Sequence, residues 1–197
     1  MNILDKFHNW RRRRRWDKQY KEGKWDNLKS EKEAKRYFQI IDYLRKHGTA
    51  NPSILDIGCG DGVLNDRMQD LEFSYFLGLD YSKVSIEQAK KKQFPKAEFI
   101  SEDVHTFTPS RKFDVIVFNE AFYYIHESEK TIVLDRMMNH LNDNGLIITS
   151  IYREGIGCWE YFKENKKLKE LDFTTITTDE ELQYWKIGAY KKVVSSQ

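Results

Sequence analysis

Apolar residues recur at intervals of three and four positions between Lys29 and His47, the spacing that places them on one face of an α-helix. The repeated positions are Ala34, Phe38, Ile41 and Leu44. Ser30 and Glu33 have the spacing of a capping box at the start of this segment, and Gly48 marks its end. The pattern predicts an amphipathic helix whose apolar face packs on the rest of the protein.

Short apolar segments alternate with helical segments after Pro52. Strands are predicted at 53–57, 75–80, 97–100, 113–118 and 145–151, and helices at about 61–70, 83–93, 128–141 and 158–168. This alternation is typical of parallel sheets, because a parallel connection needs a crossover. The segments 113–118 and 145–151 are apolar enough to be buried on both faces, which also favours a parallel sheet.

The end of the chain departs from this alternation. Segments 172–177 and 184–191 look like two strands with no helix between them, so they predict an antiparallel hairpin. The predicted fold class is therefore α/β, a Rossmann-like doubly wound sheet of seven mostly parallel strands that ends in a C-terminal antiparallel hairpin.

The composition indicates one ordinary globular domain. With 197 residues, of which 40% are hydrophobic, the chain is long enough for one buried core and short for two. No apolar run approaches the ~18 residues of a membrane-spanning helix, and the basic N-terminus lacks the apolar segment of a signal peptide. Two cysteines, Cys59 and Cys158, make no disulfide framework or metal cluster, so no metal is expected. We expect a cytoplasmic protein, monomeric or homodimeric.

Positive charge is concentrated at the start of the chain. Residues 1–36 contain thirteen Lys and Arg against six Asp and Glu, a net charge of +7, whereas the whole chain carries +2. The run Arg11–Arg15 lies between two tryptophans, a combination that suits contact with phosphates. A solvated helix or arm is the simpler interpretation of such a run. We divide the chain into a basic, aromatic segment at 1–28 and a single domain at 29–197.

Segment 54–62 is predicted to be a buried strand that runs into a glycine-rich turn. The glycines of this turn are Gly58, Gly60 and Gly62. Glycine allows a backbone with positive φ and lets a ligand approach the main chain closely. Asp56 adds a negative charge below the turn. Asp80, at the end of the next strand, is positioned to accept hydrogen bonds from ribose hydroxyls.

Two classes of adenosine ligand share this geometry. A dinucleotide-binding turn has the spacing G-x-G-x-x-G, but position 63 is Val63 instead of glycine. A negative charge at Asp56 disfavours a pyrophosphate and favours a cationic sulfonium and ammonium group. The residues therefore favour S-adenosylmethionine over NAD as the ligand.

Four ordered motifs resemble the class I S-adenosylmethionine-dependent methyltransferases over roughly residues 16–193. They are the turn Asp56–Gly62, the strand end Gly78-Leu79-Asp80, the segment Ser101-Glu102-Asp103-Val104 and the strand Phe113–Glu120. Within that class the chain is similar to the small-molecule group related to nodulation-type and sugar or amine methyltransferases. The N-terminal helix of that group often carries the pattern Trp-Asp-x-x-Tyr and Gly-x-Trp-Asp, which stands here at Trp16–Tyr20 and Gly23–Asp26.

The resemblance implies bound S-adenosylmethionine, with S-adenosylhomocysteine as its product. The implied cofactor residues are Trp16, Tyr20, Trp25, Asp56, Gly58, Cys59, Gly60, Asp80, Tyr81, Asp103, Val104 and Asn119. Asp103 is expected at the adenine amino group, Val104 at a ring nitrogen and Tyr81 on an adenine face. Asn119 is expected to meet the methionine portion, and Asp61 either caps the following helix or touches the ligand. The three N-terminal aromatic residues are expected to form a lid, with core packing as the alternative.

The methyl acceptor is expected beside the segment Glu120–His126, which follows the fourth predicted strand. Ligands bind at that edge of open α/β sheets. Glu120 and His126 are candidate bases for an acceptor that must lose a proton, and Glu120 is alternatively a binding group for a substrate cation. Tyr123 and Tyr124 are candidates to cradle an amine by cation–π contact.

The sequence thus predicts an enzyme that transfers a methyl group from S-adenosylmethionine to an O or N atom of a small-molecule acceptor. One alternative is a nucleic-acid methyltransferase that uses the basic N-terminal arm. Against it, base-amine enzymes typically carry Asp/Asn-Pro-Pro-aromatic where this chain has Asn119-Glu120-Ala121-Phe122. The other alternative is a non-catalytic protein that binds an adenosine ligand.

Overall fold

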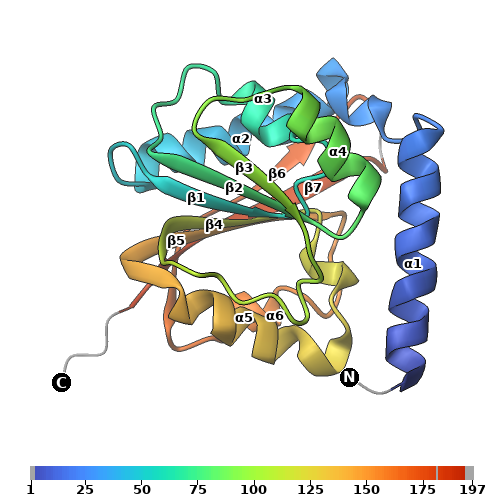
Figure 1. The fold of residues 1–197 in the computed structure, drawn as a ribbon. Coiled ribbons are helices and arrows are strands. Elements are labelled where there is room, and N and C mark those ends of the chain that lie inside the picture. The colour runs from blue at the N-terminus through green and yellow to red at the C-terminus, as the bar shows by residue number, and fades with distance from the viewer. Residues whose placement is uncertain (1–2, 181, 194–197) are drawn as a thin grey trace.

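The computed structural model describes residues 3–180 and 182–193. At its centre is a seven-stranded sheet in the order β3-β2-β1-β4-β5-β7-β6 (Figure 1). The strands are β1 (Ser53–Ile57), β2 (Tyr75–Asp80), β3 (Ala97–Ser101), β4 (Phe113–Asn119), β5 (Leu141–Tyr152), β6 (Leu168–Thr177) and β7 (Tyr184–Lys192). Strands β1 to β5 are parallel, and β7 lies antiparallel to both β5 and β6. This arrangement confirms the predicted fold class.

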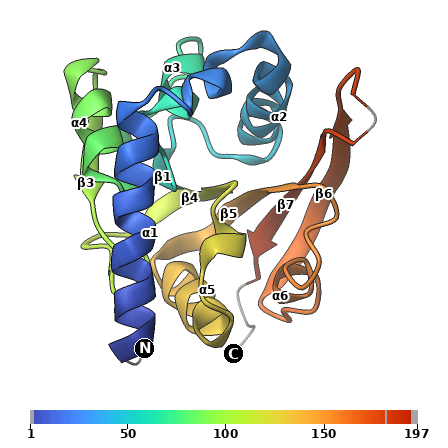
Figure 2. The same ribbon diagram turned by 90° about the vertical axis from the view of Figure 1, so that its right-hand side faces the viewer.

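Helices cover both faces of the sheet (Figure 2). The helices are α1 (Ile3–Lys21), α2 (Glu31–His47), α3 (Val63–Arg67), α4 (Lys83–Lys91), α5 (Lys130–Asn139) and α6 (Glu160–Lys163), with 3-10 turns η1 (Asp26–Lys29), η2 (Phe122–Tyr124) and η3 (Glu127–Glu129). Helices α2, α3 and α4 lie on one face, and α5 and α6 lie on the other. Helix α1 belongs to neither layer and stands along one end of the sheet (Figure 1).

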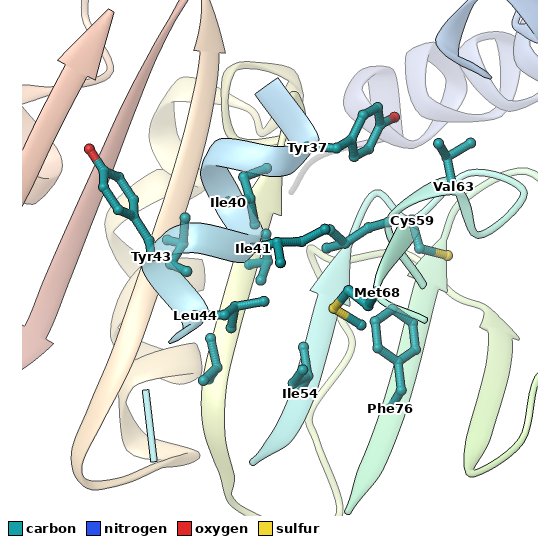
Figure 3. Close-up of a cluster of buried hydrophobic side chains, with 14 of the residues drawn as sticks. Tyr37, Ile40, Ile41, Tyr43, Leu44, Ile54, Cys59, Val63, Met68 and Phe76 are labelled. Carbon is teal, nitrogen blue, oxygen red and sulfur yellow. The ribbon is translucent and has the colours of Figure 1, made fainter. Parts of the chain in front are cut away.

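Each face of the sheet has its own apolar core, because side chains alternate between the faces along a strand. In β1, Ile54 packs in the core beneath α2, whereas Leu55 and Ile57 pack in the core above α5. Figure 3 shows the first core, where Ile40 and Leu44 of α2 lie against the sheet. The alternation brings Asp56 to the same side as Ile54, toward α2. The position of this carboxylate is important for the site described below.

Helix α2 confirms the predicted capping box and corrects the predicted apolar stripe. The Ser30 hydroxyl accepts a hydrogen bond from the Glu33 N–H at 3.4 Å, and the helix ends at His47 before Gly48. Phe38, expected in the stripe, is 49% exposed, whereas Tyr37 is buried. The buried face is therefore rotated away from Phe38 and includes a charged residue that the stripe did not predict.

Two predicted helices are much shorter than expected. Helix α3 begins at Val63 because Gly62, with φ of +83°, occupies the left-handed region and serves as its N-cap. The predicted helix at 158–168 is only the four-residue α6. Gly155 and Gly157 have positive φ just before it, and β6 starts at Leu168, so only one helical turn fits between them.

Candidate active site

A cavity of about 340 Å³ lies where the carboxyl ends of β1, β2 and β4 meet α1 and α2. Most residues expected to hold the cofactor line it, namely Trp16, Tyr20, Trp25, Gly58, Cys59, Gly60, Asp80, Tyr81, Asp103, Val104 and Asn119. The expected acceptor residues Glu120, Tyr123 and Tyr124 line the same cavity. The structure therefore brings together residues that are up to 108 positions apart, from Trp16 to Tyr124.

The glycine-rich turn after β1 forms one wall of this cavity. Gly58 and Gly60 have φ of +80° and +57°, in the left-handed region. The N–H groups of Gly58 and Cys59 both donate to the carbonyl of Leu79, at 2.8 and 3.0 Å, which fastens the turn to β2. A Cβ on Gly60 would lie 2.5 Å from the Tyr20 hydroxyl. The turn thus needs glycine both for its conformation and for the space in front of it.

Asp80 closes the floor of the cavity at the end of β2. Its carboxylate accepts hydrogen bonds from the N–H of Gly60 at 3.0 Å and from the N–H of Ser82 at 2.7 Å. Burial raises the pKa of Asp80, although these two hydrogen bonds oppose the shift by favouring the charged form. A fixed carboxylate between the glycine turn and α4 is a suitable acceptor for two neighbouring hydroxyls.

Asp56 lies below the turn, fully buried, and is not part of the cavity wall. Among the described residues neither of its carboxylate oxygens has a hydrogen-bond partner. Burial raises the pKa of Asp56 to about 8, the charge of Asp80 adds to the shift, and Arg36 opposes it. An unpartnered buried carboxylate is costly unless a positive charge lies nearby. These residues therefore fit a ligand that brings a cation to the turn.

The opposite end of the cavity is formed by the loop after β3. Asp103 accepts a hydrogen bond from the His105 N–H at 3.0 Å, and its Oδ1 lies 2.6 Å from His105 Nδ1. The other ring nitrogen of His105 accepts from the His126 N–H at 3.1 Å, so the proton of the neutral ring is on Nδ1. His105 thus joins the loop expected at the adenine to the loop after β4.

Helix α1 covers the cavity and is fastened at several points. The Asp17 carboxylate accepts from the Ser82 hydroxyl at 2.6 Å and from the Val84 N–H at 3.3 Å, at the N-terminus of α4. Trp16 lies edge-on between Tyr81 and Tyr124, with ring centroids 6.3 and 5.2 Å away. The carboxylate at a helix N-terminus is favourable both as a cap and toward the helix dipole.

Two arginines of the basic run also point into the protein. Arg12 donates to the carbonyl of Tyr124 at 2.6 Å, and Arg13 donates to the Ser101 hydroxyl at 2.8 Å. The Arg13 guanidinium lies 5.0 Å from the Tyr81 ring. The run is therefore not a uniformly solvated helix, because part of it attaches α1 to the loops that surround the cavity.

Arg36 is a residue of the site that sequence reasoning missed. It is 2% exposed, and its guanidinium donates to Glu33 at 2.7 Å, to the Tyr37 hydroxyl at 3.0 Å and to the Asn119 side chain. Arg36 and Glu33 both line the cavity. Helical spacing could have indicated that Arg36 is buried, because it stands four residues before Ile40 on the buried face of α2.

Glu120, directly after β4, has a left-handed backbone with φ of +56°, which is unfavourable for a residue with a side chain. Its carboxylate accepts from the Ser150 hydroxyl at 2.7 Å, the Tyr123 hydroxyl at 3.0 Å and the Tyr152 N–H at 3.1 Å. Burial raises the pKa of Glu120, and Arg36 and the hydrogen bonds oppose the shift. The fold therefore fixes this carboxylate on the cavity wall.

One expected residue lies elsewhere, and another takes one of its two expected roles. His126 is exposed, lies outside the cavity wall, and has Nδ1 2.9 Å from the Ser128 hydroxyl. Asp61 is not the cap of α3, since Gly62 takes that position, but it does line the cavity. Its carboxylate pairs with Lys29 at 2.9 Å and with Lys92, which follows α4, at 3.2 Å.

The sheet order, the glycine turn and the carboxylate at the end of β2 define a class I S-adenosylmethionine-dependent methyltransferase, with S-adenosylmethionine as its cofactor. The family model described as a methyltransferase domain matches residues 30–191. The chain belongs to this family. The segment that contains α1 lies outside the matched region.

Known proteins resemble the chain in sequence and in fold. Malonyl-[acyl-carrier protein] O-methyltransferase 1 of Ilyobacter polytropus is 30% identical over 64% of this chain and 46% of its own length. Ubiquinone biosynthesis O-methyltransferase of Pelagibacter ubique is 29% identical over 71% of this chain and 53% of its own length. The chain thus spans about half the length of these curated relatives.

Among solved structures, the N-methyltransferase NodS of Bradyrhizobium japonicum in complex with S-adenosylhomocysteine has a TM-score of 0.72 and 17% identity, over 85% of this chain and 91% of that one. This similarity concerns the fold. Within residues 3–180 and 182–193, no helix is both long enough and apolar enough to cross a membrane. The same residues contain no cluster of three His, Cys, Asp or Glu side chains suited to a metal ion.

Proposed function

We propose that this chain transfers a methyl group from S-adenosylmethionine to an O or N atom of a small-molecule acceptor bound beside Glu120. The observation that carries the proposal is the continuity of the cavity. One cavity extends from Asp80, which suits a ribose, to Glu120 and its aromatic neighbours. A donor and an acceptor in one cavity can be held in contact, which is most of what a direct displacement requires.

The cofactor residues retain the roles expected from the sequence. Asp80 would bind the ribose hydroxyls, and the main chain of the turn at 58–60 would contact the methionine portion. Asp103 and Val104 would bind the adenine edge, with Tyr81 against its face. Asn119 would meet the methionine portion at the end of β4.

The negative charge around the turn suits this donor. When bound, the cofactor supplies a methyl group activated by a positively charged sulfur. Glu120 beside the turn provides a negative field for that charge and for the methionine ammonium. Asp56 below the turn, whose pKa burial raises to about 8, would become charged when a cation binds.

Glu120 is the proposed general base for a methyl acceptor that must lose a proton. It lies on the cavity wall, its carboxylate is fixed by three hydrogen bonds, and its raised pKa suits a base that works near neutral pH. The His126 side chain, in contrast, lies outside the cavity. We therefore retain Glu120 and set His126 aside as a base.

Segment 1–28 is proposed to act as a lid on the domain formed by 29–197. Trp16, Tyr20 and Trp25 line the cavity from this segment, and Asp17 fastens α1 to α4. A lid excludes water from the reacting groups and strengthens the electrostatic interactions inside the cavity.

The nucleic-acid alternative is less favoured by the contacts of the basic run. Arg12 and Arg13 are used to attach α1, so fewer of the five arginines remain for phosphates. The acceptor wall also carries Glu33 and Glu120, which repel phosphates. A non-catalytic adenosine-binding role gives no reason for a fixed carboxylate in the second half of the cavity.

Calorimetric titration with S-adenosylhomocysteine tests the proposal, with NAD as the competing ligand. We expect saturable binding of S-adenosylhomocysteine only, and a loss of about 10–100-fold in affinity for Asp80→Ala, since a hydrogen-bonded charged group is removed. Asp70→Ala, at an exposed position, is the matched control and should bind as the wild type. Preferential binding of NAD, or equal affinity in Asp80→Ala, would contradict the proposal.

A further inference from the structure

The part of the cavity around Glu120 contains a carboxylate to which no cation donates a hydrogen bond within the described residues. The charged side chains that line this part are Glu33 and Arg36 on α2, Glu120 after β4, and Arg12 of α1, which donates to the carbonyl of Tyr124. Arg36 donates to Glu33, Asn119 and Tyr37, so its guanidinium N–H groups are already bound to residues of α2 and β4. The Glu33 carboxylate and the Arg36 guanidinium form a close pair. Among the described residues, no cation donates a hydrogen bond to the Glu120 carboxylate.

Neutral groups surround the Glu120 carboxylate. The three donors to its oxygens are the hydroxyls of Ser150 and Tyr123 and the main-chain N–H of Tyr152. A carboxylate can accept about four hydrogen bonds, so three donors leave capacity for one more. Because Glu120 lines the cavity, a ligand can supply that donor.

Two pairs of aromatic rings line the cavity near this carboxylate. Tyr123 and Tyr124 pack together with ring centroids 4.5 Å apart, and Tyr152 and Trp185 pack together at 6.0 Å. Arginines already lie over the second pair, with Arg153 5.0 Å from the Tyr152 ring and Arg36 5.8 Å from the Trp185 ring, so the pair of Tyr123 and Tyr124 is the one proposed to receive a ligand cation. All four residues line the cavity. Ring faces beside a carboxylate attract an organic cation, since each contact contributes about 0.5–2 kcal/mol. They also offer an apolar surface to the rest of the ligand.

We propose that the acceptor is a small amine with an aromatic or other apolar substituent, bound as an ammonium ion at Glu120 beside the rings of Tyr123 and Tyr124. This inference rests on the proposed function and specifies its acceptor. The fixed left-handed backbone of Glu120 supports it, because strain of this kind persists where a side chain must be held in one place. The amine donates to the unused position of the Glu120 carboxylate.

The chemical step balances with the groups named. The ammonium first gives one proton to the Glu120 carboxylate, which leaves a neutral amine with a free lone pair. That lone pair forms the new nitrogen–carbon bond to the methyl group as the sulfur–carbon bond breaks, and the electrons of the broken bond remain on sulfur. The product is a methylated ammonium, and Glu120 releases its proton to water.

Other acceptor classes fit this wall less well. A carboxylate acceptor would place a second negative charge beside the Glu120 carboxylate, and like charges in a partly buried site repel strongly. A neutral alcohol could donate to Glu120 but would gain little from the ring faces. The wall therefore distinguishes acceptors by charge.

The test compares amines with alcohols and acids of the same shape. Phenethylamine, 2-phenylethanol and phenylacetate are each titrated into the protein saturated with S-adenosylhomocysteine, and each is also assayed for methyl transfer. We expect the amine to bind at least about tenfold more tightly than the other two, and to lose about tenfold or more in affinity in Glu120→Gln. Glu72→Gln, an equal change of charge at an exposed site, should keep the wild-type preference.

Each outcome is decisive. Tighter binding of the alcohol or acid, transfer to either of them but not to the amine, or a preference that persists in Glu120→Gln would overturn the inference. So would absence of amine binding by protein that binds S-adenosylhomocysteine. Failure to bind S-adenosylhomocysteine at all would instead contradict the proposed function.

Discussion

Asp17 and Ser82, 65 residues apart in the sequence, are joined by a hydrogen bond of 2.6 Å that connects α1 to the N-terminus of α4. Ser82 also donates its N–H to Asp80, the carboxylate proposed to bind ribose. The attachment of α1 and the ligand-binding carboxylate thus share one residue. Cofactor binding and docking of α1 should therefore favour each other.

Replacement of Asp17 by Ala should loosen α1. The variant loses two hydrogen bonds to the N-terminus of α4, which are worth about 1 kcal/mol, or roughly a fivefold change in the population of the undocked helix. Trypsin cuts after arginine, so the run Arg11–Arg15 reports undocking directly. We expect about fivefold faster cleavage there, with S-adenosylhomocysteine slowing cleavage in the wild type. The control is Glu22→Ala, at an exposed position directly after the same helix; equal cleavage rates for both variants would exclude this role for Asp17.

Replacement of Gly60 by Ala should damage the site more than the fold. Both the positive φ and the 2.5 Å approach of a Cβ to the Tyr20 hydroxyl oppose alanine there. The backbone cost is about 1–2 kcal/mol, and loss of cofactor affinity should exceed tenfold. Gly157→Ala is a matched control, since its φ is +75° but a Cβ would meet nothing within 4 Å. Thermal unfolding should be similar for the two variants, and only Gly60→Ala should bind S-adenosylhomocysteine weakly.

Replacement of Asp56 by Asn should stabilise the free protein at high pH. The folded-state pKa of about 8 lies above that of the unfolded chain, so wild-type stability falls as pH rises from about 4 to 8. The stability of the asparagine variant does not fall in this way, because asparagine has no proton to lose in this range. At pH 9 its free energy of unfolding should exceed that of the wild type by about 1–3 kcal/mol, with a smaller difference at pH 6. Denaturation by urea at both pH values measures this, and a difference independent of pH would show that the carboxylate is not buried as described.

The same variant should bind the cofactor less well, because it lacks the negative charge that suits a cation at the turn. Gain in stability together with loss of affinity would identify Asp56 as a residue retained for binding. If Asp56→Asn binds S-adenosylmethionine as tightly as the wild type, its charge has no part in binding.

Replacement of Arg36 by Met should destabilise the protein by about 3–5 kcal/mol, since it leaves the buried Glu33 carboxylate unpaired. A second substitution, Glu33→Leu, removes that unpaired charge and should restore part of the loss. Urea unfolding of the single and double variants measures the recovery. A double variant as unstable as the single one would show that the pair contributes through packing alone.

Much of the fold could be predicted from the sequence because the signals are local. The apolar runs of β4 and β5 and the two strands without a helix between them at the C-terminus gave the sheet and its antiparallel end. Helix lengths were less accurate, since α3 and α6 are limited by neighbouring glycines and strands.

Part of the cavity wall could also be predicted, since the expected residues from Gly58 to Tyr124 stand at the end of a strand or in the turn that follows it. Other wall residues could not. Arg36 meets Asn119 across 83 positions, and Trp185 comes from β7, so only the folded chain reveals that they share a wall. The exposed position of His126 likewise follows from the fold and from no local signal.

The two halves of the cavity come from different parts of the chain. The residues proposed to contact the donor come from α1 and from the ends of β1 to β4, whereas Tyr152 and Trp185 of the proposed acceptor wall come from β5 and β7. Substitutions at these two positions are therefore expected to change the preferred acceptor more than they change the affinity for the donor. In directed evolution, a library limited to these two positions would vary the range of acceptors while the binding of the methyl donor is retained.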